Sequence, residues 1–377
     1  MTESLLVNFV YAPPVGHAIE ALHYCNGYHR ADPAKRIAVA LNAATPTELA
    51  GLCPFIDATY PIRGLDLIDG TQDVMPAIAG IPREWDWIVE DGRGRLPDQR
   101  DLFPGLARYY DESRTYFVAW DFGAAGAAPP DYRPREPFRL QLPDLPTPVG
   151  DRRPRIAVLP AGGGERELYP SIASWELVLR VLALRFPDAT FCLVGKRSRD
   201  GRTHTAFRDA EFERLRQTVP RCVAAIDVPL IDQLAAVRAC DVFISPHSGF
   251  GMAALATGTP WLAISGNKWP EYYFNGVPFY SVLPDIARFP CYTYLAPDPP
   301  LVDDDGPRSP SMSATRIRAD LDEIVEAAAG LIEQRWDYDT ALAGHVARAL
   351  RLYDGDIGRM WSVDGVLARV AARLRVD

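Results

Sequence analysis

Lysine is scarce in this chain of 377 residues, because only three of its 40 basic residues are lysine and the rest are arginine. No Lys/Arg stripe offsets the net charge of −9, so we expect no nucleic-acid partner. No apolar run reaches the roughly eighteen residues of a membrane span, and no basic region precedes the first apolar stretch. These absences predict a cytoplasmic protein without an integral membrane segment.

The six cysteines form no C-x-x-C pair, and several lie in apolar runs, as Cys192 does. We therefore expect reduced thiols in the core. Clustered Cys and His, H-E-x-x-H and G-x-S-x-G are also missing, which leaves zinc hydrolases and α/β-hydrolases without support. The P-loop pattern G-x-x-x-x-G-K-[ST] is absent, and neither half shows G-x-G-x-x-G after its first strand. No D-x-D ends a predicted strand, and we expect no metal.

Short apolar runs alternate with helical patterns in both halves of the chain. This alternation indicates βαβ units and parallel sheets. In the first half we expect strands at 5–11, 37–41, 87–89 and 116–120, and a helix at 17–28. In the second half we expect strands at 156–159, 190–194, 223–228, 242–245 and 261–264, and helices at 171–185 and 231–239.

A proline-rich connector without periodicity, residues 142–154, separates the two halves. The sequence therefore predicts two facing Rossmann-like domains with a cleft between them, over 1–148 and 149–355. A surface loop is expected at 297–313 and helices from 314 onward. We expect the last helix, within 356–377, to return to the N-terminal domain.

A glycine-containing loop follows the first strand and carries Gly16 and His17 at the start of a helix. The helix dipole lowers the pKa of a histidine at this place, which favours the neutral imidazole that a general base requires. His17 is the candidate base. Glu20, one helical turn further along, is the candidate residue for binding the acceptor. The alternative is that His17 only caps the helix or packs under the loop.

A second loop, Pro246 to Gly251, follows the strand at 242–245 and opens a helix of small residues that ends before Pro260. Ligands of open α/β sheets bind at the carboxyl ends of strands, and helix N-termini suit anions. Ser248 offers a hydroxyl for a diphosphate, and glycines allow close approach of the backbone. A third loop, Gly162 to Gly164, is a candidate for another wall of the same binding pocket. The alternative is that these glycines only satisfy turns.

Together the first two loops resemble a GT-B glycosyltransferase, most closely glycosyltransferase family 9, the heptosyltransferase group. The segment from His247 to Pro260 has the length of the family's aspartate-threonine-glycine loop and the helix after it. Gly16-His17 stands where the family has glycine and a catalytic aspartate. Glycine-histidine at this place is typical of inverting natural-product glycosyltransferases of the GT-B class, so both resemblances point to His17 as the base.

The chain departs from the family at three positions. His247 replaces the loop aspartate, and Met252 replaces a later histidine. The family's lysine before a tryptophan-proline pair corresponds to Glu167 here, which reverses a charge facing the donor phosphates. Another cation must then meet the diphosphate, and Arg166, Lys196 and Arg197 are the candidates.

The resemblance implies an inverting transferase that moves a sugar from a nucleotide-diphosphate donor to a hydroxyl of a small-molecule or glycan acceptor, with a secondary-metabolite scaffold preferred. The donor is a co-substrate, and no other cofactor is implied. The candidate donor-binding residues are His247, Ser248, Gly249, Phe250, Gly251, Gly163, Gly164, Arg166, Lys196 and Arg197. Residues 65–131, rich in Trp, Tyr and Pro, are expected to shape the acceptor pocket.

Two other functions stay open at this point. A non-hydrolysing nucleotide-sugar epimerase shares the GT-B architecture but needs several acids near the second loop, where only Asp241 and Glu271 occur. A catalytically silent GT-B protein, which binds a sugar nucleotide or supports a partner, would tolerate the altered loop. The sequence leaves the oligomeric state open.

Overall fold

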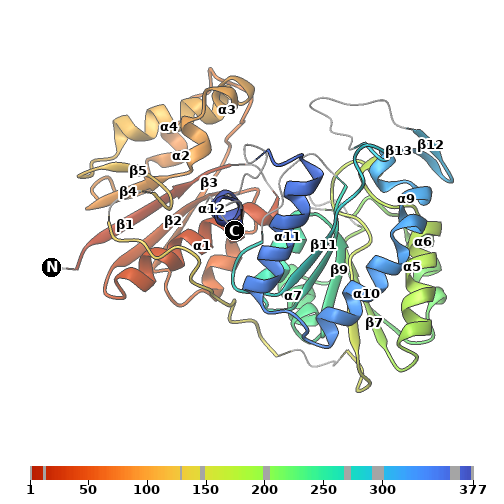
Figure 1. Ribbon diagram of the computed structural model, residues 1–377. Coiled ribbons are helices and arrows are strands. Elements are labelled where there is room, and N and C mark those ends of the chain that lie inside the picture. Colours follow the sequence, from red (N-terminus) through yellow and green to blue (C-terminus); the bar gives the residue numbers. More distant parts are fainter. Residues whose placement is uncertain are drawn as a thin grey trace. The chain divides into compact units, whose positions relative to one another are not determined.

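The computed structural model describes residues 2–11, 14–127, 130–144, 149–197, 204–266, 273–290, 301–356 and 366–374. The chain divides into two compact units, Met1–Gln141 and Leu142–Asp377. Each unit contains its own parallel sheet flanked by helices (Figure 1). The predicted α/β class with two Rossmann-like units is therefore confirmed.

Unit 1 has a five-stranded parallel sheet in the order β3-β2-β1-β4-β5. The strands are β1 (Ser4–Phe9), β2 (Arg36–Asn42), β3 (Ala58–Ile62), β4 (Trp87–Glu90) and β5 (Phe122–Ala124). Helix α1 (Val15–Ala31) covers one face of the sheet, and α2 (Met75–Ile78), α3 (Pro97–Leu102) and α4 (Pro104–Tyr116) lie on the other (Figure 1). Every residue of β1 is buried, as expected for a central strand covered on both faces.

Unit 2 has a six-stranded parallel sheet in the order β11-β10-β9-β6-β7-β8. The strands are β6 (Arg155–Val158), β7 (Thr190–Gly195), β8 (Cys222–Ile226), β9 (Val242–Pro246), β10 (Trp261–Ile264) and β11 (Phe279–Val282). The helices are α5 (Ile172–Arg185), α6 (Asp209–Thr218), α7 (Leu230–Arg238), α8 (Gly249–Leu255), α9 (Ala314–Ala319), α10 (Leu321–Ile332), α11 (Tyr338–Leu352) and α12 (Val366–Leu374). In α5, Trp175, Val178, Leu179 and Leu182 are buried at helical spacing, which packs this helix onto the sheet.

In both sheets the strand order reverses next to the first strand of the unit. In unit 1 the reversal lies between β1 and β4, and in unit 2 it lies between β6 and β9. The loops that leave two adjacent strands at such a point diverge to opposite faces, which opens a crevice at their carboxyl ends. The loops that follow β1, β4, β6 and β9 are therefore the places to look for a site.

Two expectations about local structure are wrong. The strand expected at 116–120 does not form, because α4 continues to Tyr116 and the strand begins only at Phe122. The part of the expected surface loop that the structure describes contains a hairpin, β12 (Leu301–Asp303) and β13 (Gly306–Arg308). It also contains the stretch Arg308 to Ser313, in which every residue except Pro310 is buried. The polar side chains of this stretch find partners in the unit, which composition alone does not reveal.

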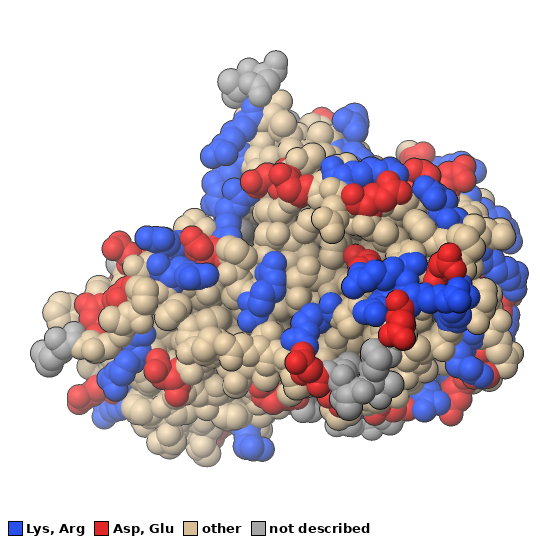
Figure 2. All heavy atoms as spheres, turned by 90° about the horizontal axis from the view of Figure 1, so that it is seen from below, with Lys and Arg blue, Asp and Glu red and all other residues tan. Residues whose placement is uncertain are grey.

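The surface carries charges of both signs. Figure 2 shows one face, on which many basic groups lie beside acidic ones. Among the described residues, no helix has both the length and the apolar character that a membrane span requires.

Candidate functional site

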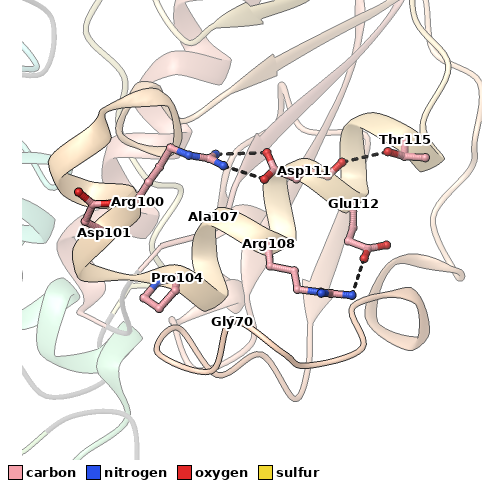
Figure 3. Close-up of a pocket in the computed structure, with 9 residues that line it drawn as sticks. All are labelled: Gly70, Arg100, Asp101, Pro104, Ala107, Arg108, Asp111, Glu112 and Thr115. Carbon is pink, nitrogen blue, oxygen red and sulfur yellow. Dashed lines mark hydrogen bonds and ion pairs between the residues drawn. The ribbon is translucent and has the colours of Figure 1, made fainter.

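Unit 1 contains a cavity of about 650 Å³, and unit 2 contains one of about 550 Å³. The unit 1 cavity lies between α3 and α4, within the segment expected to shape an acceptor pocket (Figure 3). Its two arginines are already paired, Arg100 with Asp111 at 2.7 Å and Arg108 with Glu112 at 2.9 Å. This cavity therefore offers a ligand little uncompensated charge.

The strand reversal in unit 1 brings together side chains from two distant segments. His17 and Glu20 lie in the first turns of α1, which follows β1, and the backbone N–H of His17 donates to the carbonyl of Pro14 at 3.0 Å. Asp91 and Arg93 follow β4, which is hydrogen-bonded to β1. The four side chains form one polar group, which we call the His17 cluster.

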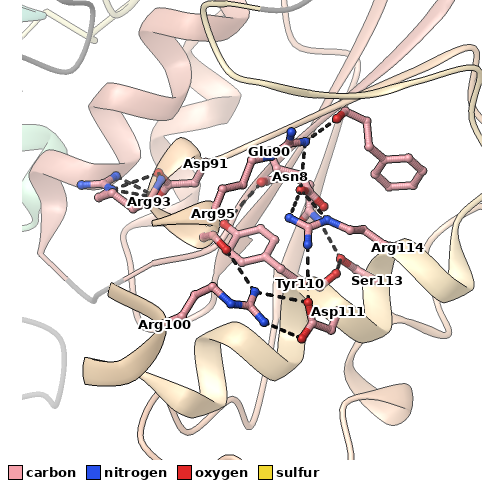
Figure 4. Close-up of polar contacts among 12 residues, drawn as sticks. Asn8, Glu90, Asp91, Arg93, Arg95, Arg100, Tyr110, Asp111, Ser113 and Arg114 are labelled. Carbon is pink, nitrogen blue, oxygen red and sulfur yellow. Dashed lines mark hydrogen bonds and ion pairs between the residues drawn. The ribbon is translucent and has the colours of Figure 1, made fainter. Parts of the chain in front are cut away.

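Arg93 is the centre of the His17 cluster. Its Nη2 lies 3.0 Å from Oε2 of Glu20 and 2.9 Å from Oδ2 of Asp91, and its Nε donates to Oδ1 of Asp91 at 3.0 Å. Figure 4 shows the guanidinium of Arg93 turned toward Asp91. The Nδ1 of His17 lies 3.3 Å from Oε2 of Glu20 and 3.3 Å from Nη1 of Arg93. One cation thus serves two carboxylates and reaches the imidazole.

Burial differs sharply within the cluster. The side chain of His17 is 19% exposed, whereas those of Glu20, Asp91 and Arg93 are 4%, 3% and 9% exposed. Buried charges persist in proteins when they are paired and hydrogen-bonded, as these are. His17 is therefore the member of the cluster that a ligand can reach.

The electrostatics favour a neutral imidazole beside an ionised carboxylate. Burial lowers the pKa of His17, and the hydrogen bond with Glu20 only partly opposes this effect. Burial raises the pKa of Glu20, but Arg93 and His17 together outweigh it and hold that pKa below its usual value. Burial also raises the pKa of Asp91, despite the neighbouring Arg93. Near neutral pH, His17 can therefore accept a proton.

A third buried carboxylate, outside the His17 cluster, fixes the loop that carries Arg93. Glu90, the last residue of β4, is fully buried and lies 2.6 Å from Nη2 of Arg114 on α4 and 3.4 Å from Nη2 of Arg95 (Figure 4). Burial raises the pKa of Glu90 in spite of both arginines. These contacts anchor the turn η2 (Gly92–Arg95) to the sheet and to α4. Because Arg93 belongs to this turn, they also hold Arg93 in place.

Tyr11 forms an aromatic wall of the cluster. Its ring centroid lies 4.1 Å from the guanidinium carbon of Arg93, and its edge-on contact with the His17 ring has a centroid distance of 4.8 Å. The Tyr11 hydroxyl donates to Oε1 of Gln99 on α3 at 2.9 Å. The exposed side of His17 is thus bordered by an aromatic ring.

Sequence reasoning singled out His17 but did not single out Asp91 or Arg93. Both follow a predicted strand in a polar, glycine-containing turn, so the strand-end rule that found His17 could also have indicated them. Glu20 was assigned to the acceptor, yet its carboxylate is buried behind His17 and already holds two partners. Its position suits contact with the imidazole better than contact with an acceptor.

In unit 2 the strand reversal brings the Gly162–Gly164 loop against the loop that follows β9. The Ser248 hydroxyl caps α8 by accepting from the backbone N–H of Gly251 at 3.2 Å. A Cβ on Gly162 would lie 3.2 Å from Cβ of Ser248 and 2.9 Å from the Tyr169 hydroxyl. Two predicted donor loops therefore meet, and glycine at position 162 lets them approach this closely.

The remaining residues of the second loop pack inward. His247 stacks on Trp261 with a centroid distance of 6.0 Å and an angle of 20°, and Phe250 packs against Phe243. A Cβ on Gly251 would lie 2.1 Å from the Trp261 ring, so this glycine serves close packing. Gly249 is the first residue of α8.

Two of the three candidate cations share the unit 2 cavity. Arg166 and Arg197 line it together with His204, Phe207 and Arg208. Lys196 is not among the described residues that line it, and its backbone N–H donates to the Thr205 hydroxyl at 2.8 Å. The cavity adjoins the glycine loop, because the N–H of Ala206 donates to the carbonyl of Gly162 at 3.0 Å.

Acidic partners already hold both predicted arginines of this cavity. Arg166 contacts Glu211 and lies 2.9 Å from Asp305, and Arg197 lies 2.7 Å from Asp227. Arg208, which sequence reasoning missed, is exposed and makes no ion pair with any residue that the structure describes. A phosphate entering the cavity would thus compete with directly paired carboxylates for Arg166 and Arg197, whereas the Arg208 side chain only feels the nearby charge of Glu211.

Comparisons with known proteins identify the fold. No family model matches the chain, and no curated protein matches it. A family 9 glycosyltransferase of Veillonella parvula matches with a TM-score of 0.55 and 11% identity, over 88% of this chain and 98% of that one. E. coli ADP-heptose LPS heptosyltransferase II matches with a TM-score of 0.53 and 12% identity, over 89% and 99%.

A third solved structure, an E. coli heptosyltransferase with ADP-2-deoxy-2-fluoro heptose, gives a TM-score of 0.51 and 11% identity, over 85% of this chain and 99% of that chain. At this level of identity the likeness establishes the fold alone. The chain therefore has the GT-B fold, as the two loops in the sequence predicted.

Proposed function

We propose that this protein is an inverting glycosyltransferase that moves a sugar from a nucleotide-diphosphate donor to a hydroxyl group, with His17 as the base. The observation that carries this proposal is the His17 cluster. A neutral, partly exposed imidazole stands at the carboxyl edge of a sheet, and the charged groups behind it are buried and paired. General bases of this kind need both access and a pKa below the working pH.

The reaction would proceed in one displacement. His17 takes the proton of the acceptor hydroxyl as its oxygen attacks the anomeric carbon from the side opposite the diphosphate. The new C–O bond forms while the bond from the anomeric carbon to the diphosphate oxygen breaks. The electron pair leaves with the nucleotide diphosphate, and the configuration at the anomeric carbon inverts.

The donor is proposed to bind unit 2. A diphosphate needs N–H donors, hydroxyls and a cation. The Gly162–Gly164 loop and Ser248 supply the first two. Arg208 at the adjoining cavity supplies a cation whose side chain forms no ion pair within the described part of the chain. The E. coli neighbour named as an ADP-heptose heptosyltransferase supports a nucleotide sugar as the donor class.

The acceptor is proposed to bind unit 1, beside His17 and Tyr11. As the acceptor we prefer a secondary-metabolite scaffold. The arginine-rich, lysine-poor composition is typical of GC-rich genomes, in which pathways for such compounds are common. We propose that the reaction takes place in the cytoplasm.

Two observations favour a second candidate, a GT-B protein that binds a sugar nucleotide without turnover. Glu167 stands where the resembling family has its phosphate-facing lysine, and Arg166 and Arg197 are occupied by carboxylates. Such a protein would bind nucleotides, and this binding would not depend on His17.

The test begins with a thermal-shift panel of UDP, GDP, ADP, dTDP and CDP. A ligand at one hundred times its Kd stabilises the folded state by about 2.7 kcal/mol, which raises the Tm measurably. His17→Ala should then keep the shift and lose turnover of the matching nucleotide sugar, whereas His29→Ala, further along α1, should keep both. Absence of any shift would contradict the donor site, and turnover by His17→Ala would contradict the assigned base.

A further inference from the structure

We infer that Glu20 is a positioning residue for His17, because its carboxylate accepts the Nδ1 proton and leaves the Nε2 lone pair for the acceptor hydroxyl. Arg93 holds Glu20 in place and keeps it charged. This inference rests on the proposed function, since it assigns the base its working tautomer.

Glu20 and Arg93 compete for Nδ1 of His17. Oε2 of Glu20 and Nη1 of Arg93 both lie 3.3 Å from this atom. A neutral imidazole has one N–H, so Nδ1 either donates to Glu20 or accepts from Arg93. In the second case Nε2 carries the proton, and the exposed side of His17 has no lone pair for a base.

Contacts of Arg93 with three residues decide the competition in favour of Glu20. Arg93 donates to Asp91 and Glu20 at 2.9 to 3.0 Å, so carboxylates hold its guanidinium more closely than the imidazole does. The face of that guanidinium lies 4.1 Å from the Tyr11 ring centroid, a further partner for its charge. Charge-assisted bonds to carboxylates are stronger than a bond to a neutral ring nitrogen.

Glu20 also needs the imidazole proton. Its carboxylate is buried, and Nη2 of Arg93 supplies one donor to Oε2. A buried carboxylate with unfilled acceptor capacity is destabilising, and an N–H from His17 fills part of it. Asp91, in contrast, accepts from the side chain and backbone N–H of Arg93 and has no need of the imidazole.

The arrangement also suits the charged state formed during the reaction. When Nε2 takes the acceptor proton, the imidazolium faces Glu20 through Nδ1–H and is stabilised by that negative charge. The groups that face His17 are Glu20 on α1, Asp91 and Arg93 after β4, and Tyr11 after β1. The two carboxylates raise the pKa of His17, whereas burial and Arg93 lower it.

The test uses ¹⁵N NMR of the full chain with labelled histidine, in which the His17 signals are identified by their loss in His17→Ala. We expect wild-type His17 to carry its proton on Nδ1 near neutral pH. Glu20→Gln should shift the tautomer toward Nε2–H and lower the turnover number by about 100-fold or more. The acidic limb of its pH profile should move to lower pH, because a group that raises the pKa of His17 is gone.

Matched variants keep the test decisive. Glu20→Asp should restore part of the activity, and Asp91→Asn, which removes the other carboxylate of Arg93, should leave the tautomer on Nδ1. A wild-type Nε2–H tautomer overturns the inference without any variant. Glu20→Gln with unchanged tautomer, pH profile and turnover also overturns it. Failure of the proposed function is recognised separately, by turnover in His17→Ala or by the absence of nucleotide binding.

Discussion

The hydroxyl of Tyr169 accepts a hydrogen bond from the backbone N–H of Gly164 at 2.9 Å, and the ring to which it belongs is buried in the core of unit 2. The same hydroxyl lies 2.9 Å from where a Cβ of Gly162 would be. One buried side chain thus sets the shape of the glycine loop that follows β6 and that faces Ser248.

Tyr169→Phe should therefore weaken binding of the nucleotide that gives the largest thermal shift, because the loop loses its fixed shape. We expect a decrease in affinity of several-fold, measured by calorimetry, with a loss of unfolding free energy of about 1 kcal/mol. Tyr338→Phe is the matched control, since its hydroxyl donates to the carbonyl of Tyr273 at 2.8 Å elsewhere in unit 2. An equal loss of affinity in both variants would refute a role for the loop.

The pH dependence of turnover should reflect the lowered pKa of His17. Burial lowers this pKa below 6.5, so the imidazole stays neutral and able to accept a proton as the pH falls through 6.5. We expect kcat/KM to stay level from pH 8 down past 6.5 and to decline only at lower pH. A decline centred at or above pH 6.5 would show that His17 is not the group that controls the rate.

The positions of His17 and Ser248 could be predicted because each follows an apolar run that becomes a buried parallel strand. That local pattern is visible in the sequence, and the carboxyl ends of such strands carry ligands. The contact of Arg93 with Glu20 spans 73 residues and exists only because β4 lies beside β1. Strand order is decided by packing of the whole unit, which no local pattern contains.

Arg308 shows a second limit of sequence reasoning. It lies in an Asp-, Pro- and Ser-rich segment that favours a surface loop, yet its side chain is fully buried. It donates to the carbonyls of Arg166 and Tyr169 and pairs with Asp305. A buried arginine is tolerated only with such partners, and the two carbonyl groups come from another part of the chain.

The stability of the protein should depend on pH through His345. This histidine is buried against Tyr273 and Phe279, and burial lowers its pKa to about 3. The unfolded chain takes up a proton on this residue below pH 6.5 and the folded chain does not, so stability falls as the pH falls from 6.5 toward 3.

Between pH 7 and pH 5, His345 should account for a loss of about 2 kcal/mol in the free energy of unfolding, at about 1.4 kcal/mol for each pH unit below 6.5. Urea denaturation at several pH values measures this loss, and His345→Leu should remove it. A His345→Leu variant with the wild-type slope over this range would show that other groups cause the pH dependence.

Gly251→Ala should disturb the second loop through packing and not through loss of a donor. The added Cβ would lie 2.1 Å from the ring of Trp261, whose Nε1 is held by the Ser245 hydroxyl at 3.0 Å, so α8 must shift away. Overpacking of this kind lowers the free energy of unfolding by about 1–3 kcal/mol. Gly51→Ala is the control, because a Cβ there meets no described atom within 4 Å. Ser248 caps the N-terminus of α8, so a shift of this helix moves the Ser248 hydroxyl. We therefore also expect nucleotide binding to weaken in Gly251→Ala and to stay unchanged in Gly51→Ala. Unchanged denaturation and unchanged binding in that variant would contradict the close packing of α8 on Trp261.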